Sequence, residues 1–266
     1  MERAIRSIKE ALGLELREHI ALVGGGGKSS LMFALAAELR HENKRIITTT
    51  TTKVWHRQAL KAPCFMILDS SDYSENALIE RLGQHGHVFL GERILDNGKI
   101  EGVSATLGDL LFNEQSVDYL IVEADGAAGR PAKAPAEHEP VIPSSVTKVI
   151  AVLGLDALGK VMGPDTVFRE KPFMEITGIH PGEILKPKAL SKLFSNPRGL
   201  CKGTPPGAIR MAFLNKLDTL SNEKEAEYLA ASILNESLSQ IDRVILGSVE
   251  KGFYYVLSQP SVCGRI

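Results

Sequence analysis

The sequence is poor in cysteine, has no excess of charge of either sign and contains no long apolar run. Cys64, Cys201 and Cys263 lie far apart and outside any CxxC or Cys/His cluster, so we expect neither a disulfide framework nor a structural zinc site. A formal charge of -1 predicts no polybasic face, which argues against nucleic acid as a partner. No apolar run reaches the roughly 18 residues that span a bilayer, and residues 1–14 (MERAIRSIKEALGL) predict an amphipathic helix rather than a signal peptide. We therefore expect a cytoplasmic protein without a membrane partner.

The chain does contain a run of consecutive glycines near its start. Residues 19–23 (HIALV) have the apolar, partly β-branched composition of a short buried strand. The glycines follow directly and lead into Lys28 and a helical pattern. Strand, glycine turn, Lys-Ser and helix are the parts of a phosphate-binding loop. The residues expected to bind a nucleotide here are Gly24, Gly25, Gly26, Gly27, Lys28, Ser29 and Ser30.

Each residue type in this loop has a chemical reason. Glycine adopts positive φ without steric cost and lets backbone N–H groups surround an anion. Lys28 would bring an ammonium to the β- and γ-phosphates, and the Ser29 hydroxyl would bind Mg²⁺. The spacing departs from GxxxxGK[ST], because Leu22 stands where that pattern has glycine; the remaining GxxGKS is a shortened loop like that of the Mur ligases. The alternative is a glycine-rich turn beside a solvated lysine.

Five consecutive threonines follow the next apolar segment, at residues 48–52. All five suit a strand, because threonine is β-branched. In the second interpretation the strand stops near Thr49, and the remaining hydroxyls line the carboxyl edge of the sheet, where ligands of open α/β sheets bind. Thr50, Thr51, Thr52 and Lys53 are then candidate substrate or switch residues. Which threonine would approach the metal is left open.

A second chemical feature occupies residues 118–143 (DYLIVEADGAAGRPAKAPAEHEPVIP). Residues 119–122 predict a fully apolar strand, and Glu123 stands at its end, where nucleotide-hydrolysing proteins place a carboxylate on the Mg²⁺ side. Asp125 follows two residues later. One of these carboxylates would bind the metal while the other orients an attacking water. The predicted catalytic residues are therefore Lys28, Glu123 and Asp125. The predicted metal ligands are Ser29, Glu123 and Asp125. An acidic turn that ends a strand is the structural alternative.

The proline-rich part of the same stretch contains Arg130, Lys133 and His138. A proline-stiffened loop with charges of both signs, next to a catalytic strand end, indicates a substrate platform or switch. A solvated linker is the alternative. A single histidine without a partner at ligand spacing is more often a hydrogen-bonded surface group than a metal ligand.

A third feature is IRMAFLNKLD, residues 209–218. A predicted strand ends in Asn215, Lys216 and Asp218, the NKxD arrangement that recognises guanine. The Asp carboxylate accepts from two N–H donors of guanine that adenine lacks, the Asn side chain supports the loop and the Lys stem packs on the base. A site that pairs such donors rejects the analogue without them by a large factor.

The pattern as a whole predicts an α/β fold, with a doubly wound, mostly parallel sheet of the P-loop nucleotide-hydrolase type. Residues 1–153 and 207–266 are expected to form the nucleotide-binding domain, and the Gly- and Pro-rich residues 154–206 a small irregular helical insertion. Asn-Gly at 97–98 between apolar runs predicts a β-hairpin over 93–100. Further strands are expected at 64–68, 87–90, 148–153, 210–214, 243–249 and 253–257, and helices at 74–82, 106–112, 173–178, 188–194 and 223–238.

In this order, GxxGKS, Glu-x-x-Gly after a strand, and NKxD resemble the metallocentre-assembly GTPases, including the nickel chaperones of hydrogenase and urease. Over nearly the full chain the sequence more closely resembles the YqeC-like family, through LVGGGGKSSLMFALA, IITTTTTKVW, VEADGAAGRPAKAPAEHEPVIP, VLGLDALGK and FLNKLD. That family is described as accessory proteins of selenium-dependent molybdenum hydroxylases, acting in selenium cofactor biosynthesis or insertion. The resemblance therefore implies a molybdenum hydroxylase or a cofactor-assembly protein as partner, and it implies no settled reaction.

From the residues we expect a protein that binds Mg²⁺ with GTP or ATP and hydrolyses the nucleotide. Two alternatives stay open. An ATP-dependent ligase or small-molecule kinase of Mur-ligase type shares the short loop and the strand-end Glu, and would hold its acidic substrate through Arg130 and Lys133. A non-hydrolysing module would use the nucleotide only to set a conformation for a partner.

Overall fold

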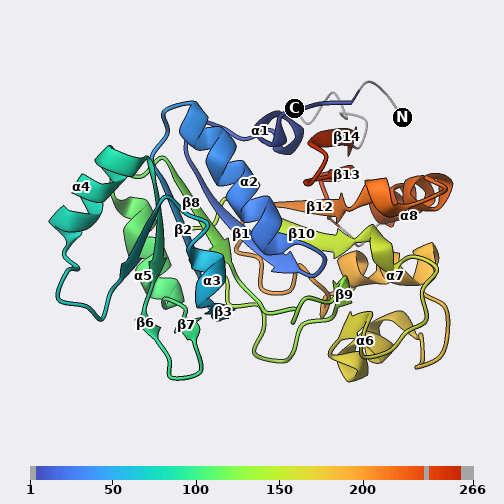
Figure 1. Cartoon of the computed structure of the whole chain (residues 1–266). Coiled ribbons are helices and arrows are strands. Elements are labelled where there is room, and N and C mark those ends of the chain that lie inside the picture. Colours follow the sequence, from blue (N-terminus) through green and yellow to red (C-terminus); the bar gives the residue numbers. More distant parts are fainter. Residues whose placement is uncertain (1–3, 237–239, 259–266) are drawn as a thin grey trace.

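A nine-stranded sheet forms the centre of the computed structural model, which describes residues 4–236 and 240–258 (Figure 1). The strand order is β14-β13-β12-β10-β1-β8-β2-β5-β4. All neighbouring strands are parallel except β13 and β14, which are antiparallel. The strands are β1 (Glu18–Gly24), β2 (Ile46–Thr50), β4 (Cys64–Ile67), β5 (His87–Gly91), β8 (Tyr119–Glu123), β10 (Lys148–Gly154), β12 (Ile209–Asn215), β13 (Arg243–Ser248) and β14 (Phe253–Ser258). The predicted α/β class and mostly parallel sheet are confirmed.

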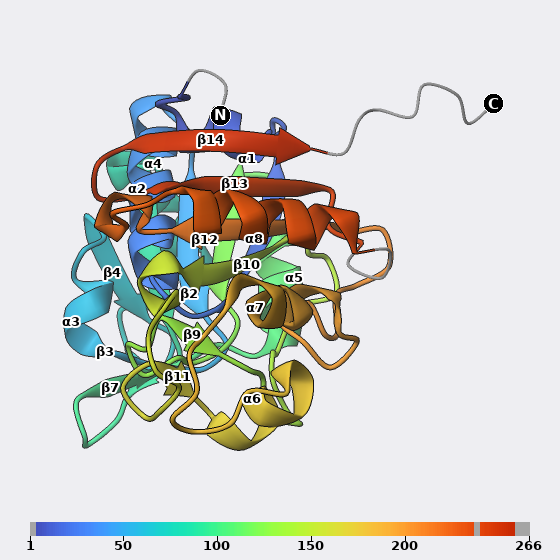
Figure 2. The ribbon, with the colours of Figure 1, turned by 90° about the vertical axis from the view of Figure 1, so that its right-hand side faces the viewer.

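Helices cover both faces of this sheet, which is why its central strands β1, β8 and β10 are apolar over most of their length, with charged residues at their ends. Every residue of β1, β8 and β10 is buried. On one face, Ile20 and Leu22 of β1 pack in the same cluster as side chains of α1 (Ile8–Leu12) and α2 (Lys28–His41). On the other face, Ala21 and Val23 join a cluster with α7 (Pro187–Ser195) and α8 (Lys224–Asn235). Figure 2 shows α8 lying alongside β12 and β13.

The second face continues over β2, β5 and β8, where α4 (Glu75–His85) and α5 (Ala105–Asn113) pack. The Ser74 side chain accepts a hydrogen bond from the Ala77 N–H and so fixes the start of α4, as the sequence predicts. Helices on both faces of a mostly parallel sheet are consistent with a doubly wound fold.

Small strands lie outside the main sheet. The predicted hairpin is confirmed as β6 (Arg93–Ile94) and β7 (Lys99–Glu101), and β7 also pairs with β3 (Lys53–Trp55), which the sequence did not predict. The short helix α3 (His56–Ala59) follows β3. β9 (Ala132–Lys133) pairs with β11 (Val167–Phe168).

The N-terminal helix is shorter than predicted. Among the described residues it spans only Ile8–Leu12, because the Ser7 side chain caps it by accepting from the Glu10 N–H, and Gly13 ends it in the left-handed region. Ile5 instead forms an antiparallel bridge with Tyr254. The expectation of one amphipathic helix over the whole segment is wrong for residues 4–7 and 13–14, and residues 1–3 lie outside the described part. Near the C-terminus, α8 stops at Asn235. Residues 237–238, which the sequence also predicts to be helical, lie outside the described residues.

The interval 154–206 contains η1 (Leu155–Ala157), β11, α6 (Glu170–Thr177) and α7. Phe173 of α6 and Leu190 of α7 belong to the same buried cluster as the strands β10 and β12. The interval therefore packs directly on the sheet. The expected division of the chain into a nucleotide-binding domain and an insertion stays a prediction.

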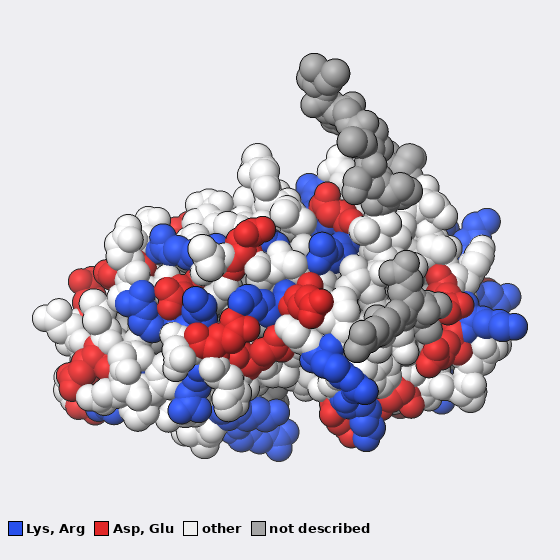
Figure 3. Space-filling model, turned by 90° about the horizontal axis from the view of Figure 1, so that it is seen from above, with Lys and Arg blue, Asp and Glu red and all other residues white. Residues whose placement is uncertain are grey.

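Acidic and basic side chains are interspersed on the face seen from above in Figure 3. In the part of the chain that the structure describes, no helix has the length and apolar character needed to span a membrane.

Candidate functional site

Three of the sequence features meet at the carboxyl edge of the sheet. The order β12-β10-β1-β8 places the ends of β1, β8 and β12 within four adjacent strands. Leu22 of β1 is in register with Glu123 of β8, and Gly154 of β10 with Asn215 of β12. The carboxyl edge of such a sheet, near a point where the strand order reverses, is where ligands of open α/β folds bind.

The glycine loop (residues 24–27) is pressed against the strands beside it. The N–H of Gly25 donates to the Val152 carbonyl at 2.9 Å. A Cβ at Gly24 would stand 2.2 Å from the same carbonyl oxygen, and a Cβ at Gly26 would stand 2.1 Å from the Gly154 nitrogen. Gly24, Gly26 and Gly27 also have positive φ. Close backbone packing and positive φ together explain why the turn uses glycine.

The helix that follows this loop begins without a capping side chain. Gly27 is its N-cap residue, and Leu31 donates the first backbone hydrogen bond back to the Gly27 carbonyl. Among the described residues, none supplies an acceptor to the backbone N–H groups of Gly27, Lys28, Ser29 and Ser30. Unpaired N–H groups and the positive end of the dipole of a 14-residue helix suit an anion such as phosphate.

The Lys28 side chain is buried and faces two carboxylates, Glu123 at the end of β8 and Asp125 just after it. Its Nζ lies 3.1 Å from Asp125 Oδ1 and 3.5 Å from Glu123 Oε1, and donates to the Gly24 carbonyl at 2.6 Å. Burial lowers the pKa of Lys28, but the charges of Asp125 and Glu123 outweigh it and raise the pKa above its usual value. Lys28 is therefore a protonated ammonium beside two carboxylates, and a phosphate would have to compete with them.

Ser29 and Glu123 form the second pair of the site. The Ser29 hydroxyl donates to Glu123 Oε2 at 2.7 Å, so two of the three predicted metal ligands are in contact although they are far apart in sequence. Gln58 of α3 donates through Nε2 to the same hydroxyl at 3.3 Å. Gln58 belongs to no motif in the sequence, and its position a few residues after the threonine run is the one signal that it offers.

Asp125 contacts more groups than its place in the sequence suggests. Both of its carboxylate oxygens accept from the Gly24 N–H, at 3.1 and 3.0 Å. Its Oδ2 also lies 3.1 Å from the Nζ of Lys133, which is fully buried. Lys133 therefore lies inside the protein, not on an exposed face of the proline-rich loop.

Glu139 is the second carboxylate that pairs with Lys133. Lys133 Nζ donates to Glu139 Oε2 at 2.8 Å, and Arg169 donates to both Glu139 oxygens at 3.0 and 2.9 Å. Burial raises the pKa of Glu139, but the hydrogen bonds from Arg169 and Lys133 outweigh it and lower the pKa to about 2. Arg169 is half-buried and is held on Glu139 by both hydrogen bonds.

β2 ends at Thr50, close to the end expected in the second interpretation, so Thr51 and Thr52 follow the strand. The Thr50 hydroxyl donates to the Glu123 carbonyl at 2.8 Å, and the Thr51 hydroxyl donates to the Val141 carbonyl at 2.7 Å. The hydroxyls of the other four threonines are hydrogen-bonded, whereas that of Thr52 has no hydrogen-bond partner among the described residues. It lies near Gly126, where an added Cβ would stand 3.9 Å from the Thr52 Oγ1. Thr52 is thus the threonine available to a ligand.

Asn215 joins the NKxD segment to the glycine loop. Its Nδ2 donates to the Gly26 carbonyl at 2.9 Å. Lys216, in the left-handed region, donates through Nζ to Asp156 Oδ2 at 2.6 Å. Asp218, in η2 (Leu217–Thr219), is exposed. Asp156 was not singled out as a site residue in the sequence.

The side chains of the remaining candidate residues lie apart from this cluster, although the backbone carbonyl of Arg130 accepts from the Gly26 N–H at 3.0 Å. Arg130 is half-buried, donates to the Pro164 carbonyl and lies 3.7 Å from Asp165. Lys53 and His138 are exposed. The structure therefore brings Lys133, but neither Lys53 nor His138, to Lys28 and Asp125.

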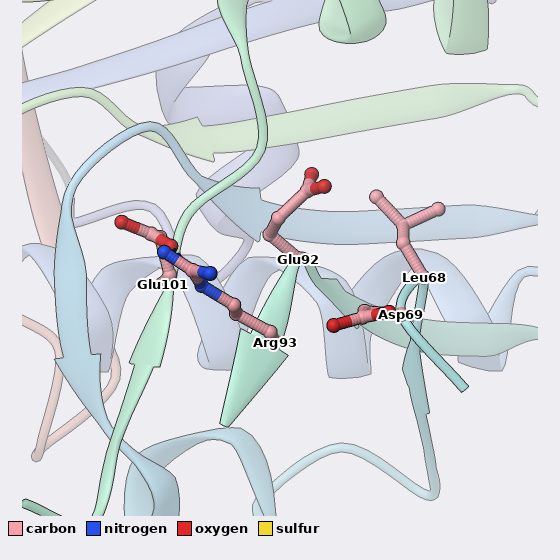
Figure 4. Close-up of a pocket in the computed structure, with 5 residues that line it drawn as sticks. All are labelled: Leu68, Asp69, Glu92, Arg93 and Glu101. Atoms are coloured by element: carbon pink, nitrogen blue, oxygen red, sulfur yellow. Dashed lines mark hydrogen bonds and ion pairs between the residues drawn. The ribbon is translucent and has the colours of Figure 1, made fainter. Parts of the chain in front are cut away.

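A separate pocket lies near the ends of β4 and β5 and the β6–β7 hairpin (Figure 4). In it the Arg93 guanidinium pairs with Glu101 at 2.5 Å. Its lining residues are Leu68, Asp69, Glu92, Arg93 and Glu101. None of them belongs to the glycine-loop cluster.

The fit of Mg²⁺ to these residues follows from the donor set. Within residues 4–236 and 240–258, no cluster of three or more His, Cys, Asp or Glu side chains is arranged to hold a metal ion. Mg²⁺ at nucleotide sites is held by one or two protein oxygens, with waters and phosphates completing an octahedron. The Ser29 and Glu123 oxygens fit a Mg²⁺ ion whose other ligands are waters and phosphate oxygens. They are too few to hold a metal ion by protein ligands alone.

The fold and this cluster define an α/β protein with a mostly parallel sheet and a glycine-rich loop packed against buried charged residues at its carboxyl edge. A model of the YqeC protein family matches residues 20–171, which include the loop, the threonines and the proline-rich stretch. A protein of Escherichia coli (strain K12), "Uncharacterized protein YqeC", is 32% identical over 234 residues, covering 87% of this chain and 88% of that protein. The chain belongs to the YqeC family, as its sequence motifs suggest.

Proposed function

We propose that the chain is a Mg²⁺-dependent P-loop nucleotide-binding protein that hydrolyses GTP, or ATP, and acts as an accessory factor in the maturation of selenium- and molybdenum-containing hydroxylases. The observation that carries the proposal is the contact between Ser29 and Glu123, beside the uncapped start of α2 and the Lys28 ammonium. A loop that binds triphosphate needs these four components together: free N–H groups, an ammonium, a hydroxyl and a carboxylate.

Each residue has a definite role in the proposed site. The N–H groups of residues 27–30 bind phosphate oxygens, and Lys28 exchanges its carboxylate partners for the β- and γ-phosphates. Ser29 and Glu123 hold Mg²⁺, which when bound neutralises charge on the phosphates. Gln58 lies within reach of the Ser29 hydroxyl and is positioned to orient a water beside it.

The preference for guanine rests on the NKxD segment. Asn215 is used to hold the loop, because its amide donates to Gly26. The exposed Asp218 carboxylate is left to accept from the base. Lys216 is tied to Asp156, which fixes its stem beside the loop. Guanine offers two adjacent donors to such a carboxylate, and adenine offers none in that position.

The proposed pathway rests on the resemblance of the motifs to metallocentre-assembly GTPases and on membership of the YqeC family. A molybdenum hydroxylase or a cofactor-assembly protein is the proposed partner. Nucleotide turnover would then change the threonine and proline-rich segments, which contact the carbonyls of Glu123 and of the following Ala124.

Thermal unfolding with a panel of nucleotides, with and without Mg²⁺, tests the binding part of the proposal. We expect MgGTP to raise the melting temperature more than MgATP, and both more than the nucleotide with EDTA. A turnover assay then separates the three alternatives. Phosphate release without any added acid identifies a hydrolase, and ADP formation that requires a small acid identifies a ligase or kinase. Binding without turnover identifies a switch module. No melting shift with any nucleotide would contradict the proposal.

A further inference from the structure

The ammonium proposed to bind phosphate is held by two carboxylates, and its release has an electrostatic cost. Lys28 Nζ is 3.1 Å from Asp125, a residue that is 1% exposed. If Lys28 moves to a phosphate, Asp125 loses a cation without gaining water. Leaving a buried charge without its partner is strongly unfavourable. Some other group must therefore stay with Asp125 for the exchange to occur.

Lys133 meets this requirement. Its ammonium is fully buried and lies 3.1 Å from Asp125 Oδ2, whereas Lys28 lies 3.1 Å from the other oxygen, Oδ1. It also donates to the Gly126 carbonyl at 2.7 Å, which fixes it to the segment that follows β8. Unlike Lys28, it contacts neither Glu123 nor the glycine loop in any interaction of the described residues. Its position thus does not change when a ligand takes Lys28.

The balance of charge supports the same assignment. The cluster contains three cations, Lys28, Lys133 and Arg169, and three anions. The anions are Glu123, Asp125 and Glu139. When Lys28 binds phosphate and Glu123 binds Mg²⁺, one charge of each sign leaves the cluster. The four groups that remain, Asp125, Lys133, Glu139 and Arg169, still alternate in sign and sum to zero.

We propose that Lys133 is a positioning residue of the nucleotide site: it keeps Asp125 paired and bound to the Gly24 N–H, and so frees Lys28 to engage phosphate. The inference rests on the proposed function, because it assumes that Lys28 binds a nucleotide. Glu139 and Arg169 hold Lys133 in place in turn. Without Lys133, Asp125 has Lys28 as its one cation, and Lys28 stays on the carboxylate.

Lys133→Met tests this directly, since methionine fills similar space and Glu139 keeps its two hydrogen bonds from Arg169. Calorimetric titration of wild type and variant with MgGTP and MgATP is expected to show at least about 10-fold weaker binding for the variant. Lys202→Met is the matched control. The Lys202 ammonium also binds the proline-rich loop, but it donates to the backbone carbonyls of Ala136 and Glu137, at 2.9 and 2.6 Å, and not to a carboxylate. We expect it to bind within about 3-fold of wild type, since a surface tie of this kind contributes little.

The second arm separates charge pairing from packing. In an Asp125→Asn background the carboxylate that Lys28 shares with Lys133 is gone, and Lys28 keeps only Glu123, which Lys133 does not contact. Adding Lys133→Met should then change affinity by less than about 3-fold. Equal loss from Lys133→Met in both backgrounds would indicate a packing role and overturn the inference. If Lys133→Met does not fold, Lys133→Gln, which keeps a donor to the Gly126 carbonyl, replaces it with the same expected weakening. A wild type that binds neither nucleotide removes the proposed function and this inference with it, whereas a wild type that binds and a variant of equal affinity overturn the inference alone.

Discussion

The Asn215 side chain joins the glycine loop to the end of β13. Its Nδ2 donates to the Gly26 carbonyl at 2.9 Å, and its Oδ1 accepts from the Val249 N–H at 3.1 Å. One amide therefore ties together segments that are far apart in the chain. Because Asn215 is buried, both hydrogen bonds are shielded from water, and loss of the side chain leaves a donor and an acceptor unpaired.

Asn215→Ala is expected to lower the free energy of unfolding by about 1–3 kcal/mol, which is the cost of unpaired buried polar groups. We also expect weaker nucleotide binding, because the Gly26 carbonyl loses its anchor. Urea unfolding and calorimetry measure the two effects. Asn113→Ala is the control, since Asn113 is exposed. Equal stability of both variants would show that the amide does not hold the loop.

Glu123→Gln should leave nucleotide binding in place and lower turnover by about 10²-fold or more, the usual range for loss of an acid–base or metal-orienting carboxylate. Glutamine keeps the shape of Glu123 and its contact with Ser29 but lacks the negative charge. Single-turnover phosphate release with saturating nucleotide measures the effect. Asp125→Asn is assayed beside it, and normal turnover in Glu123→Gln with slow turnover in Asp125→Asn would move the role to Asp125.

Asp218→Asn should shift base preference from guanine toward xanthine by about 10-fold or more, because it replaces an acceptor by a donor at the base. Competition between GTP and xanthosine triphosphate for the protein measures the ratio. Because Asp218 is exposed, we expect the substitution to leave the stability of the fold unchanged, so a change in base preference reports on recognition of the base. An unchanged ratio would argue against guanine recognition by this segment.

Two buried histidines should make the fold sensitive to acid. Burial lowers the pKa of His19 to about 4, and burial likewise lowers the pKa of His87 to about 4, from 6.5. Both are neutral in the folded protein, where His19 hydrogen-bonds Ser145 and His87 hydrogen-bonds Thr48. The unfolded chain therefore binds protons first as pH falls, and stability is lost between pH 6.5 and 4, with no contribution above that range.

The loss approaches about 3 kcal/mol for each histidine near pH 4, at 1.36 kcal/mol for each unit of pKa. Urea unfolding at pH 7.5, 6 and 5 gives the slope. We expect His87→Asn to reduce the steepness of the decline, although it also removes the contact with Thr48. A free energy of unfolding that does not change over this range would contradict the assignment of both rings as neutral.

Much of the fold follows from the sequence because its signals are local. The buried strands are continuous apolar runs, Ser74 caps α4, and Asn97 with Gly98 marks the β6–β7 hairpin. The N-terminal helix was overestimated because Ile5 gains a strand partner, Tyr254, at the far end of the chain. Periodicity within residues 1–14 contains no information about that partner.

The site was predictable where a motif fixes its own local geometry. Lys28 and Ser29 lie at the start of α2, and Glu123 ends β8, as the motifs predict. The pairing of Lys133 with Asp125 and the reach of Gln58 to Ser29 depend on how separate segments pack, so no spacing in the chain could reveal them. The sequence supplied the residue types, and the tertiary structure decides which of them meet.

The central claim, that the glycine loop binds a triphosphate through Lys28, is tested most directly by calorimetric titration of MgGTP and MgATP into wild type, Lys28→Ala and Lys160→Ala. Lys160 is an exposed lysine and serves as the matched control. We predict measurable binding to wild type and Lys160→Ala and none to Lys28→Ala. Unchanged affinity in Lys28→Ala would contradict the account.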